Sequence, residues 1–264
     1  MAFTSSPKEN YLLAALPDSE FQALLPDLEP VAMPAGLSLC ESGSAATHAY
    51  FPTSAIVSLQ YVLESGSSVE VGMVGRMGMV GLSVLLGGNS APTRAVVLSA
   101  GRGFRLKSRI AKEAFDKTGQ FMFLSLLYTQ ALITQVGQTG ACNRHHRLDQ
   151  RLCRWLLLTV DRIPESNLVL TQELIANVLG VRREAVTEAA LKLQRAGLIR
   201  YARGHIDILD RHGLEQRSCE CYEIIRMEYE RLFAVMRPDG APTGQWQHAP
   251  LPYARVQREG VFRK

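Results

Sequence analysis

The segment 170–199 constrains the fold most, because its apolar residues recur at helical spacing on both sides of Gly180. The first helix has apolar positions 174, 175 and 178, and the second has 186, 189, 190 and 193. Polar side chains crowd into the first two turns of the second helix, the end that enters the DNA major groove in a recognition helix. The segment therefore predicts a helix-turn-helix, with a plain helical hairpin as the alternative.

A β-hairpin is predicted directly after this helix pair. Residues 198–201 and 205–209 are β-prone and flank a turn with Gly204, which can adopt a positive φ. Together these elements predict a winged helix-turn-helix, in which arginine can pair with guanine and glutamate can accept from cytosine. The side chains expected at DNA are Thr171, Arg182, Arg183, Glu184, Thr187, Glu188, Lys192, Arg203 and His205.

The run TQELIANVLGVRREAVTEAALKLQRAGLI resembles the DNA-binding domain of the catabolite-activator and fumarate-nitrate-regulator (CRP/FNR) superfamily of bacterial transcription regulators. The resemblance places Arg183 and Glu184 at the start of the recognition helix and Thr171 at a phosphate contact, where it also suits an N-cap. Glu188 departs from the pattern, which has Arg there. A carboxylate would lose a guanine contact and repel phosphate, so we expect a different operator.

Short β-prone runs punctuated by glycine fill residues 28–107, as expected for a jelly roll or barrel. Residues 74–97 resemble the phosphate-binding cassette of the superfamily's sensor domain. This resemblance places an effector pocket at Gly81, Leu82, Ser83 and Arg94. An apolar Leu82 follows Gly81 where cyclic-nucleotide binders carry the Glu that holds the ribose. We therefore expect no cyclic AMP cofactor and interpret Arg94 as a surface or salt-bridged arginine.

Residues 121–136 predict a long helix that is apolar nearly all round. One face would pack on the roll and the other on a partner's helix, as at the superfamily's dimer axis; a simple buried core helix is the alternative. Gly137 and Gly140 would weaken the helix before a hinge. By the resemblance, the adenine contacts of cyclic-AMP receptors would fall near Val136 and Gly137 and are missing. The dimer helix would use Phe121, Leu124, Tyr128 and Leu132.

Five cysteines, at 40, 142, 153, 219 and 221, show no CxxC spacing, which argues against a disulfide framework and a zinc ribbon. Cys142 lies near His145 and His146, but that segment offers no further ligand for tetrahedral zinc, so we predict no metal site. Cys219 and Cys221 would lie on one helix and point in different directions.

The net charge of +4 neither supports nor excludes DNA as a partner. The chain shows no secretory leader and no apolar run long enough for a membrane span, which predicts a cytoplasmic protein without a membrane partner. No phosphate loop and no grouping of nucleophile and base emerge, so an enzyme is not expected.

These features predict an α+β protein with an amino-terminal β-roll, jelly-roll and cyclic-nucleotide-binding-like. The expected function is sequence-specific transcription regulation by a homodimer on a palindromic operator, with RNA polymerase as a candidate partner and either an unknown effector or none. The alternative is a small-ligand sensor whose helix-turn-helix contacts protein. The expected parts are 1–117, the roll with an amino-terminal helical segment; 118–143, the central dimerisation helix and hinge; 144–236, the winged helix-turn-helix; and 237–264, a flexible extension.

Overall fold

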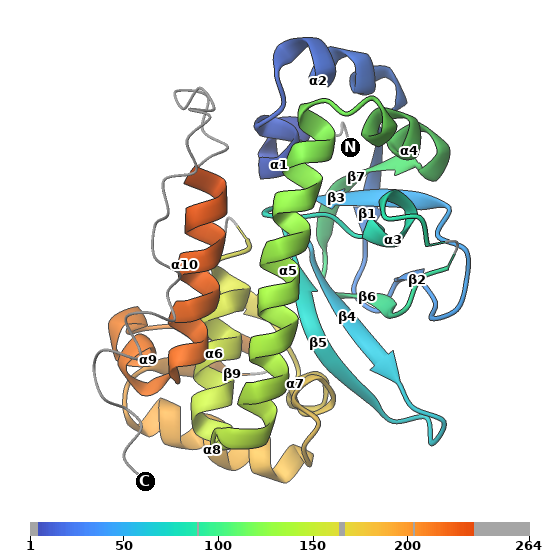
Figure 1. Cartoon of the computed structure of the whole chain (residues 1–264). Coiled ribbons are helices and arrows are strands. Elements are labelled where there is room, and N and C mark those ends of the chain that lie inside the picture. The colour runs from blue at the N-terminus through green and yellow to red at the C-terminus, as the bar shows by residue number, and fades with distance from the viewer. Residues whose placement is uncertain (1–4, 89, 164–166, 203, 235–264) are drawn as a thin grey trace, which may run out of the picture.

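The computed structural model describes residues 5–88, 90–163, 167–202 and 204–234, and combines helices with sheets as the sequence predicts (Figure 1). An amino-terminal β-roll lies against one long helix, and a helical domain with a small sheet follows it. Among the described residues, no helix has both the length and the apolar character that a membrane span requires.

The β-roll consists of two antiparallel sheets, with strand orders β1-β7-β3 and β2-β6-β4-β5. The expected roll is therefore confirmed. Inward-facing side chains such as Phe51, Ile56 and Leu106 are fully buried between the sheets and the helices that cover them. The strands are β1 (Glu29–Met33), β2 (Ser38–Cys40), β3 (His48–Pro52), β4 (Ile56–Val62), β5 (Ser68–Val74), β6 (Arg94–Ser99) and β7 (Gly101–Lys107).

Short helices cover one end of the roll. Buried Asn10 fixes the first of them: its side-chain oxygen accepts from the N–H groups of Leu12 and Leu13, and its amide donates 2.9 Å hydrogen bonds to the carbonyls of Pro52 and Gly78. One side chain thus caps a helix and anchors it to the roll. The helices are the 3-10 helices η1 (Pro7–Glu9) and η2 (Leu25–Asp27), and α1 (Tyr11–Ala14), α2 (Asp18–Leu24), α3 (Leu82–Leu85) and α4 (Ser108–Asp116).

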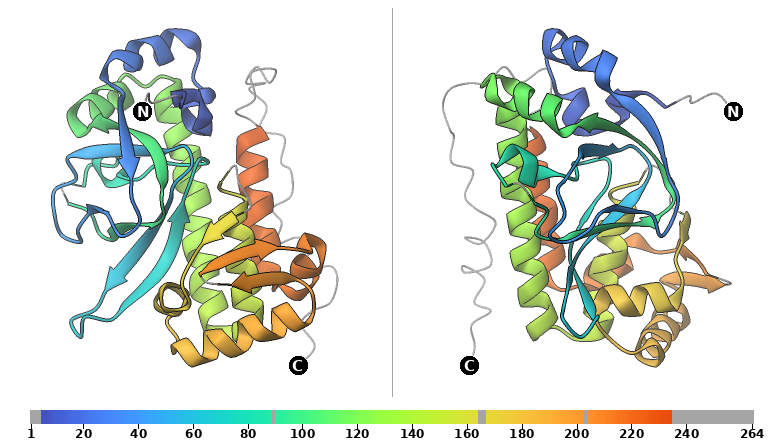
Figure 2. Two further views of the ribbon diagram at one scale, coloured as in Figure 1. Left: turned by 180° about the vertical axis from the view of Figure 1, so that it is seen from behind. Right: turned by 90° about the vertical axis from the view of Figure 1, so that its right-hand side faces the viewer.

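Helix α5 (Gln120–His145) runs along the molecule and contacts both β5 and the last helix, α10 (Glu220–Ala234) (Figures 1 and 2). The carboxylate of Glu20 accepts from the N–H groups of Gln120 and Phe121, which satisfies two donors at the start of α5. The helix passes through Gly137 and Gly140 without a break. The chain turns at His146, beyond both glycines.

The carboxy-terminal half contains the predicted helix pair and wing, together with a third strand that the sequence did not indicate. The small sheet has the order β8-β10-β9. Its elements are α6 (Leu148–Val160), β8 (Asn167–Val169), α7 (Gln172–Leu179), α8 (Arg183–Arg195), β9 (Ile199–Ala202), β10 (His205–Ile208) and α9 (Arg211–Arg217).

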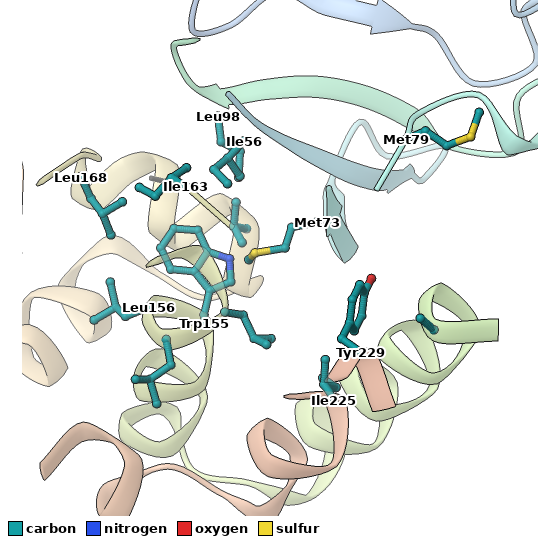
Figure 3. Packing of buried hydrophobic residues seen from close by; sticks show 14 of the residues in the cluster. Ile56, Met73, Met79, Leu98, Trp155, Leu156, Ile163, Leu168, Ile225 and Tyr229 are labelled. Atoms are coloured by element: carbon teal, nitrogen blue, oxygen red, sulfur yellow. The ribbon is translucent and has the colours of Figure 1, made fainter. Parts of the chain in front are cut away.

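One continuous apolar core joins the two halves. Figure 3 shows Trp155 of α6 beside Met73 of β5, between the strands of the roll and the helices. Both side chains are at most 2% exposed. Ile225 and Tyr229 of α10 extend the same core (Figure 3). The β-roll and the carboxy-terminal half therefore share packing in this conformation.

Candidate nucleic-acid interface

The α7–α8 pair has the geometry of a helix-turn-helix. The Thr171 hydroxyl caps α7 by accepting from the Leu174 N–H at 3.2 Å, as expected of an N-cap. Gly180 ends α7 in the left-handed conformation, with φ of 63°, which a side chain would strain. Val178 and Val186 are buried on the facing sides of the two helices. The turn therefore fixes α8 across α7.

Charged side chains stand on the outer surface at the start of α8. Arg182, Arg183 and Glu184 are exposed, as the sequence predicts for side chains that read a base edge. Thr187 is half-buried, and its hydroxyl donates to Gln172 Oε1 at 2.7 Å. This bond ties Thr187 to α7, so it is less free to meet DNA than its neighbours.

Glu188 and Lys192 lie one turn further along α8 and form an ion pair of 2.8 Å. The hydrogen bond from Lys192 lowers the pKa of the Glu188 carboxyl. Both residues are exposed, so the pair is weak and can open at a phosphate backbone.

The wing is the β9–β10 hairpin. His205 is exposed at the start of β10, opposite Ala202 of β9, near the expected tip. The Tyr201 hydroxyl donates to the Leu170 carbonyl at 3.0 Å, which secures the wing to the chain before α7. Arg203 lies outside the described residues.

A cavity of about 290 Å³ in the roll contains three of the four residues expected at the effector pocket: Gly81, Leu82 and Ser83. Arg94 does not line it and instead pairs with Glu41, with Nε and Oε2 3.2 Å apart. Among the described residues that line the cavity, none is arginine or lysine. His48 also lines the cavity, but burial lowers the pKa of its imidazole and so disfavours the charged form. A cyclic phosphate would therefore meet no permanent cation from these residues, whereas a largely apolar ligand would find a matching wall.

Helix α5 supplies Thr129, Leu132 and Ile133 to this cavity. Val136 and Gly137, which the resemblance places near the adenine contacts, lie a turn further along α5 and do not line the cavity. Of the three α5 residues at the cavity Thr129 is the polar one, and its hydroxyl donates a 2.8 Å hydrogen bond to the Ser125 carbonyl.

The predicted dimer side chains are mostly inside the protomer. Phe121, Leu124 and Tyr128 are at most 4% exposed, and Leu132 is half-buried at the cavity. Assigning the first three to a partner interface is therefore wrong for this conformation, because all three are buried in the protomer's own apolar core.

The outward face of α5 carries other apolar side chains. Leu126 is 44% exposed and Ile133 is 66% exposed, one heptad apart. Gly137 and Gly140 continue the same exposed face, with open space around both. Residues at this spacing form one stripe along a helix.

Cys142 and His146, at the end of α5, meet Cys219 and Cys221 near the start of α10. The expectation that Cys219 and Cys221 point apart is wrong, because Cys219 precedes the first residue of α10. The segment around Cys142 holds no further ligand beside its histidines. The fold, however, brings Cys219, 77 residues later in the chain, to 3.5 Å from the Cys142 sulfur. The sequence does contain a pattern that could have indicated this cluster, a Cys-x3-His at 142–146 together with a distant Cys-x-Cys at 219–221.

Comparison with known proteins agrees with this geometry. The family model of the Crp-like helix-turn-helix domain matches residues 150–217. No curated protein sequence matches the chain.

Solved structures resemble most of the described fold. FixK2 from Bradyrhizobium japonicum is 15% identical with a TM-score of 0.63, over 73% of this chain and 98% of its own. A CRP/FNR-family transcriptional regulator from Eubacterium rectale is 21% identical with a TM-score of 0.59, over 79% and 98%. The c-di-GMP-responsive global regulator CLP from Xanthomonas campestris is 14% identical with a TM-score of 0.59, over 73% and 99%.

The family match and the structural likeness cover different lengths of the chain. The domain match is confined to the helix-turn-helix half, and the structures extend the likeness to the roll and α5. This chain thus has the fold of the CRP/FNR transcriptional regulators, and its residues 150–217 are a Crp-like helix-turn-helix domain.

Proposed function

We propose that this protein is a homodimeric, sequence-specific DNA-binding transcription regulator that acts without cyclic AMP. The observation that carries the proposal is the start of α8, where Arg183 and Glu184 are exposed at the end of a recognition helix. In a Crp-like domain that end enters the major groove, where arginine pairs bidentately with guanine and glutamate accepts from cytosine.

A second copy of the chain would dock on the exposed stripe of α5. Leu126 and Ile133 offer apolar surface, and Gly137 and Gly140 leave room for a close approach of two helices. A two-fold pair of α8 helices would then read a palindrome with half-sites about one helical turn apart. RNA polymerase is the partner through which such a regulator would act on transcription.

The cavity in the roll supports independence from cyclic AMP. Leu82 cannot accept hydrogen bonds from a ribose, and the Arg94 guanidinium is paired with Glu41 outside the cavity. A buried anion without a cation is costly, so a cyclic phosphate would bind poorly. An effector, if the protein uses one, would match the largely apolar wall.

The alternative function is a small-ligand sensor whose helix-turn-helix contacts protein rather than DNA. Two interactions within the protomer favour this alternative: the hydrogen bond from Thr187 to Gln172 and the Glu188–Lys192 ion pair. Both reduce the number of free polar groups on α8. DNA recognition remains the proposal, since the first turn of α8 keeps its exposed arginines.

The deciding experiment is a selection of genomic DNA fragments by the purified protein, without added ligand and at near-physiological salt to suppress non-specific phosphate binding. Enrichment of a palindromic site is the expected result. A selection without sequence enrichment, repeated with cell extract as a source of effectors, would reject DNA recognition in favour of the alternative.

A further inference from the structure

The thiols of Cys142, Cys219 and Cys221 and the imidazole of His146 converge between the end of α5 and the start of α10. Their ligand atoms all lie within 4.8 Å of one another. The three cysteines are at most 4% exposed and form a small cluster separate from the main apolar core. This arrangement is outside both the helix-turn-helix and the cavity of the roll.

The distances within the cluster fit a tetrahedral metal site. A zinc ion with Zn–S bonds of about 2.3 Å and Zn–N bonds of about 2.0 Å has S···S edges of about 3.8 Å and S···N edges of about 3.5 Å. The Cys142 and Cys219 sulfurs are 3.5 Å apart, and Cys221 Sγ is 3.5 Å from His146 Nδ1. The four groups therefore need only small adjustments to share one ion.

The histidine is oriented as a metal ligand would be. Its Nδ1 faces the sulfurs, while its Nε2 lies 3.2 Å from Oε1 of Glu220. Metal-bound histidines usually donate their second N–H to a carboxylate, which fixes the ring and raises its basicity. Cysteines buried merely as small apolar side chains would not require an imidazole that is held between a carboxylate and a thiol.

The charge around the cluster also suits a thiolate-rich site. Three thiolates, one neutral imidazole and Zn²⁺ carry a net charge of −1. Arg154 is a buried cation, only 3% exposed, and it donates to Thr139 Oγ1 at 3.1 Å from the neighbouring helix α6. Its positive charge acts on Cys142. The opposite charges would compensate each other inside the protein.

From this geometry we propose that Cys142, His146, Cys219 and Cys221 form a structural zinc site that joins the end of α5 to the start of α10. The ion would connect α5, which contacts the roll, with α10, which follows the wing and α9. It would thereby fix the turn between α5 and α6, at which the helix-turn-helix half begins. The proposal concerns the protomer and does not depend on DNA binding.

The test uses the full-length protein expressed with added zinc and purified under reducing conditions. Elemental analysis is expected to find one equivalent of zinc per chain. After removal of zinc with a chelator, Co²⁺ is expected to bind with the near-ultraviolet thiolate charge-transfer band and strong visible bands of tetrahedral cobalt. Returning Zn²⁺ should abolish the cobalt spectrum.

Adjacent residues provide matched controls. His146→Ala should lose the tightly bound metal, whereas His145→Ala, one position away and exposed, should keep it. Glu220→Gln should weaken zinc affinity about 10- to 100-fold, because it removes the carboxylate behind the ligand, whereas Glu223→Gln in the same helix should have no effect. Cys40→Ser, outside the cluster, should also retain a full equivalent.

Three results would overturn the proposal. One is a failure of the folded, reduced protein to bind either Zn²⁺ or Co²⁺ stoichiometrically. Another is a Cys142–Cys219 disulfide in protein isolated with thiols blocked at lysis. The third is iron with inorganic sulfide, which would show a cluster in place of a zinc ion. If His146→Ala does not fold, the Glu220→Gln and Glu223→Gln pair still decides the assignment.

Discussion

The indole N–H of Trp155 donates a 2.9 Å hydrogen bond to Oε1 of Glu70 and so links α6 to strand β5 of the roll. The other carboxyl oxygen accepts from the Ser58 hydroxyl at 2.6 Å. Burial raises the pKa of Glu70 to about 7, although both hydrogen bonds act in the opposite direction. A carboxyl group at the junction of the two halves therefore changes its charge near neutral pH.

This residue should make the stability of the protein depend on pH. The folded pKa of about 7 exceeds the ordinary carboxyl value of 4.5, so the folded state holds the proton more tightly than the unfolded chain. The stabilisation that Glu70 gives to the folded state is then fully present below pH 4.5. It is lost as pH rises from 4.5 through about 7, and it no longer changes at higher pH. The free energy of unfolding should fall by about 3 kcal/mol over this range because of this group.

Urea unfolding of the wild type and Glu70→Gln at several pH values from 4.5 to 8 measures this contribution. The free energy of unfolding of Glu70→Gln, taken relative to that of the wild type, should increase as pH rises. Trp155→Phe should move the transition to higher pH, because it removes a hydrogen bond that favours the carboxylate. Parallel pH profiles for wild type and Glu70→Gln would contradict the prediction.

Replacing Arg183 by alanine should weaken binding to the selected operator by about 1–3 kcal/mol, or about 5- to 150-fold, and relax specificity at one base pair. Arg109→Ala, at an exposed position of α4 beside the roll, is the matched control and should leave affinity unchanged. Fluorescence anisotropy at fixed salt gives both values. Equal affinities for the two variants would favour protein contact by α8.

Calorimetric titration with cyclic AMP should show no binding in the micromolar range. The reason is that the described lining of the cavity contains neither arginine nor lysine to meet the phosphate. A cyclic-AMP-dependent regulator titrated in the same buffer serves as the positive control. A heat signal that saturates with a dissociation constant in the micromolar range would show that the protein binds cyclic AMP and would reject effector-free action.

An aspartate at position 133 should dissociate the proposed dimer. Ile133 is 66% exposed in the protomer, so Ile133→Asp leaves the fold intact while placing a charge in the proposed helix–helix contact. Sedimentation velocity should show a monomer for Ile133→Asp and a dimer for Leu209→Asp, whose apolar side chain is 56% exposed elsewhere. An unchanged dimer in the Ile133 variant would mean that another surface is used.

The parts of the fold that local sequence determines could be predicted. The helix-turn-helix follows from apolar spacing around Gly180, whose positive φ ends α7, and the wing follows from β-prone runs around Gly204. The exposed start of α8 follows from the same periodicity. Each of these features depends on contacts between residues close in sequence.

Features that depend on distant pairings could not be predicted in this way. The apolar faces of α5 indicate from the sequence that other elements cover this helix. They do not indicate that the roll and α10 are the elements that cover most of it. For this reason the sequence pattern assigns Phe121 and Tyr128 to a partner, although both are buried in the core of the protomer. The four-residue cysteine and histidine cluster was missed for the same reason, because Cys219 approaches Cys142 only in the folded chain.

Helix α10 also determines the order in which the molecule can be completed during synthesis. Phe233, near its end, makes an edge-to-face ring contact with Tyr11 of α1, with ring centroids 6.1 Å apart. Phe233 emerges from the ribosome more than two hundred residues after Tyr11. Amino-terminal segments generally begin folding first during translation. Here α1 gains this ring contact only after the 222 residues that follow Tyr11 have been translated up to Phe233.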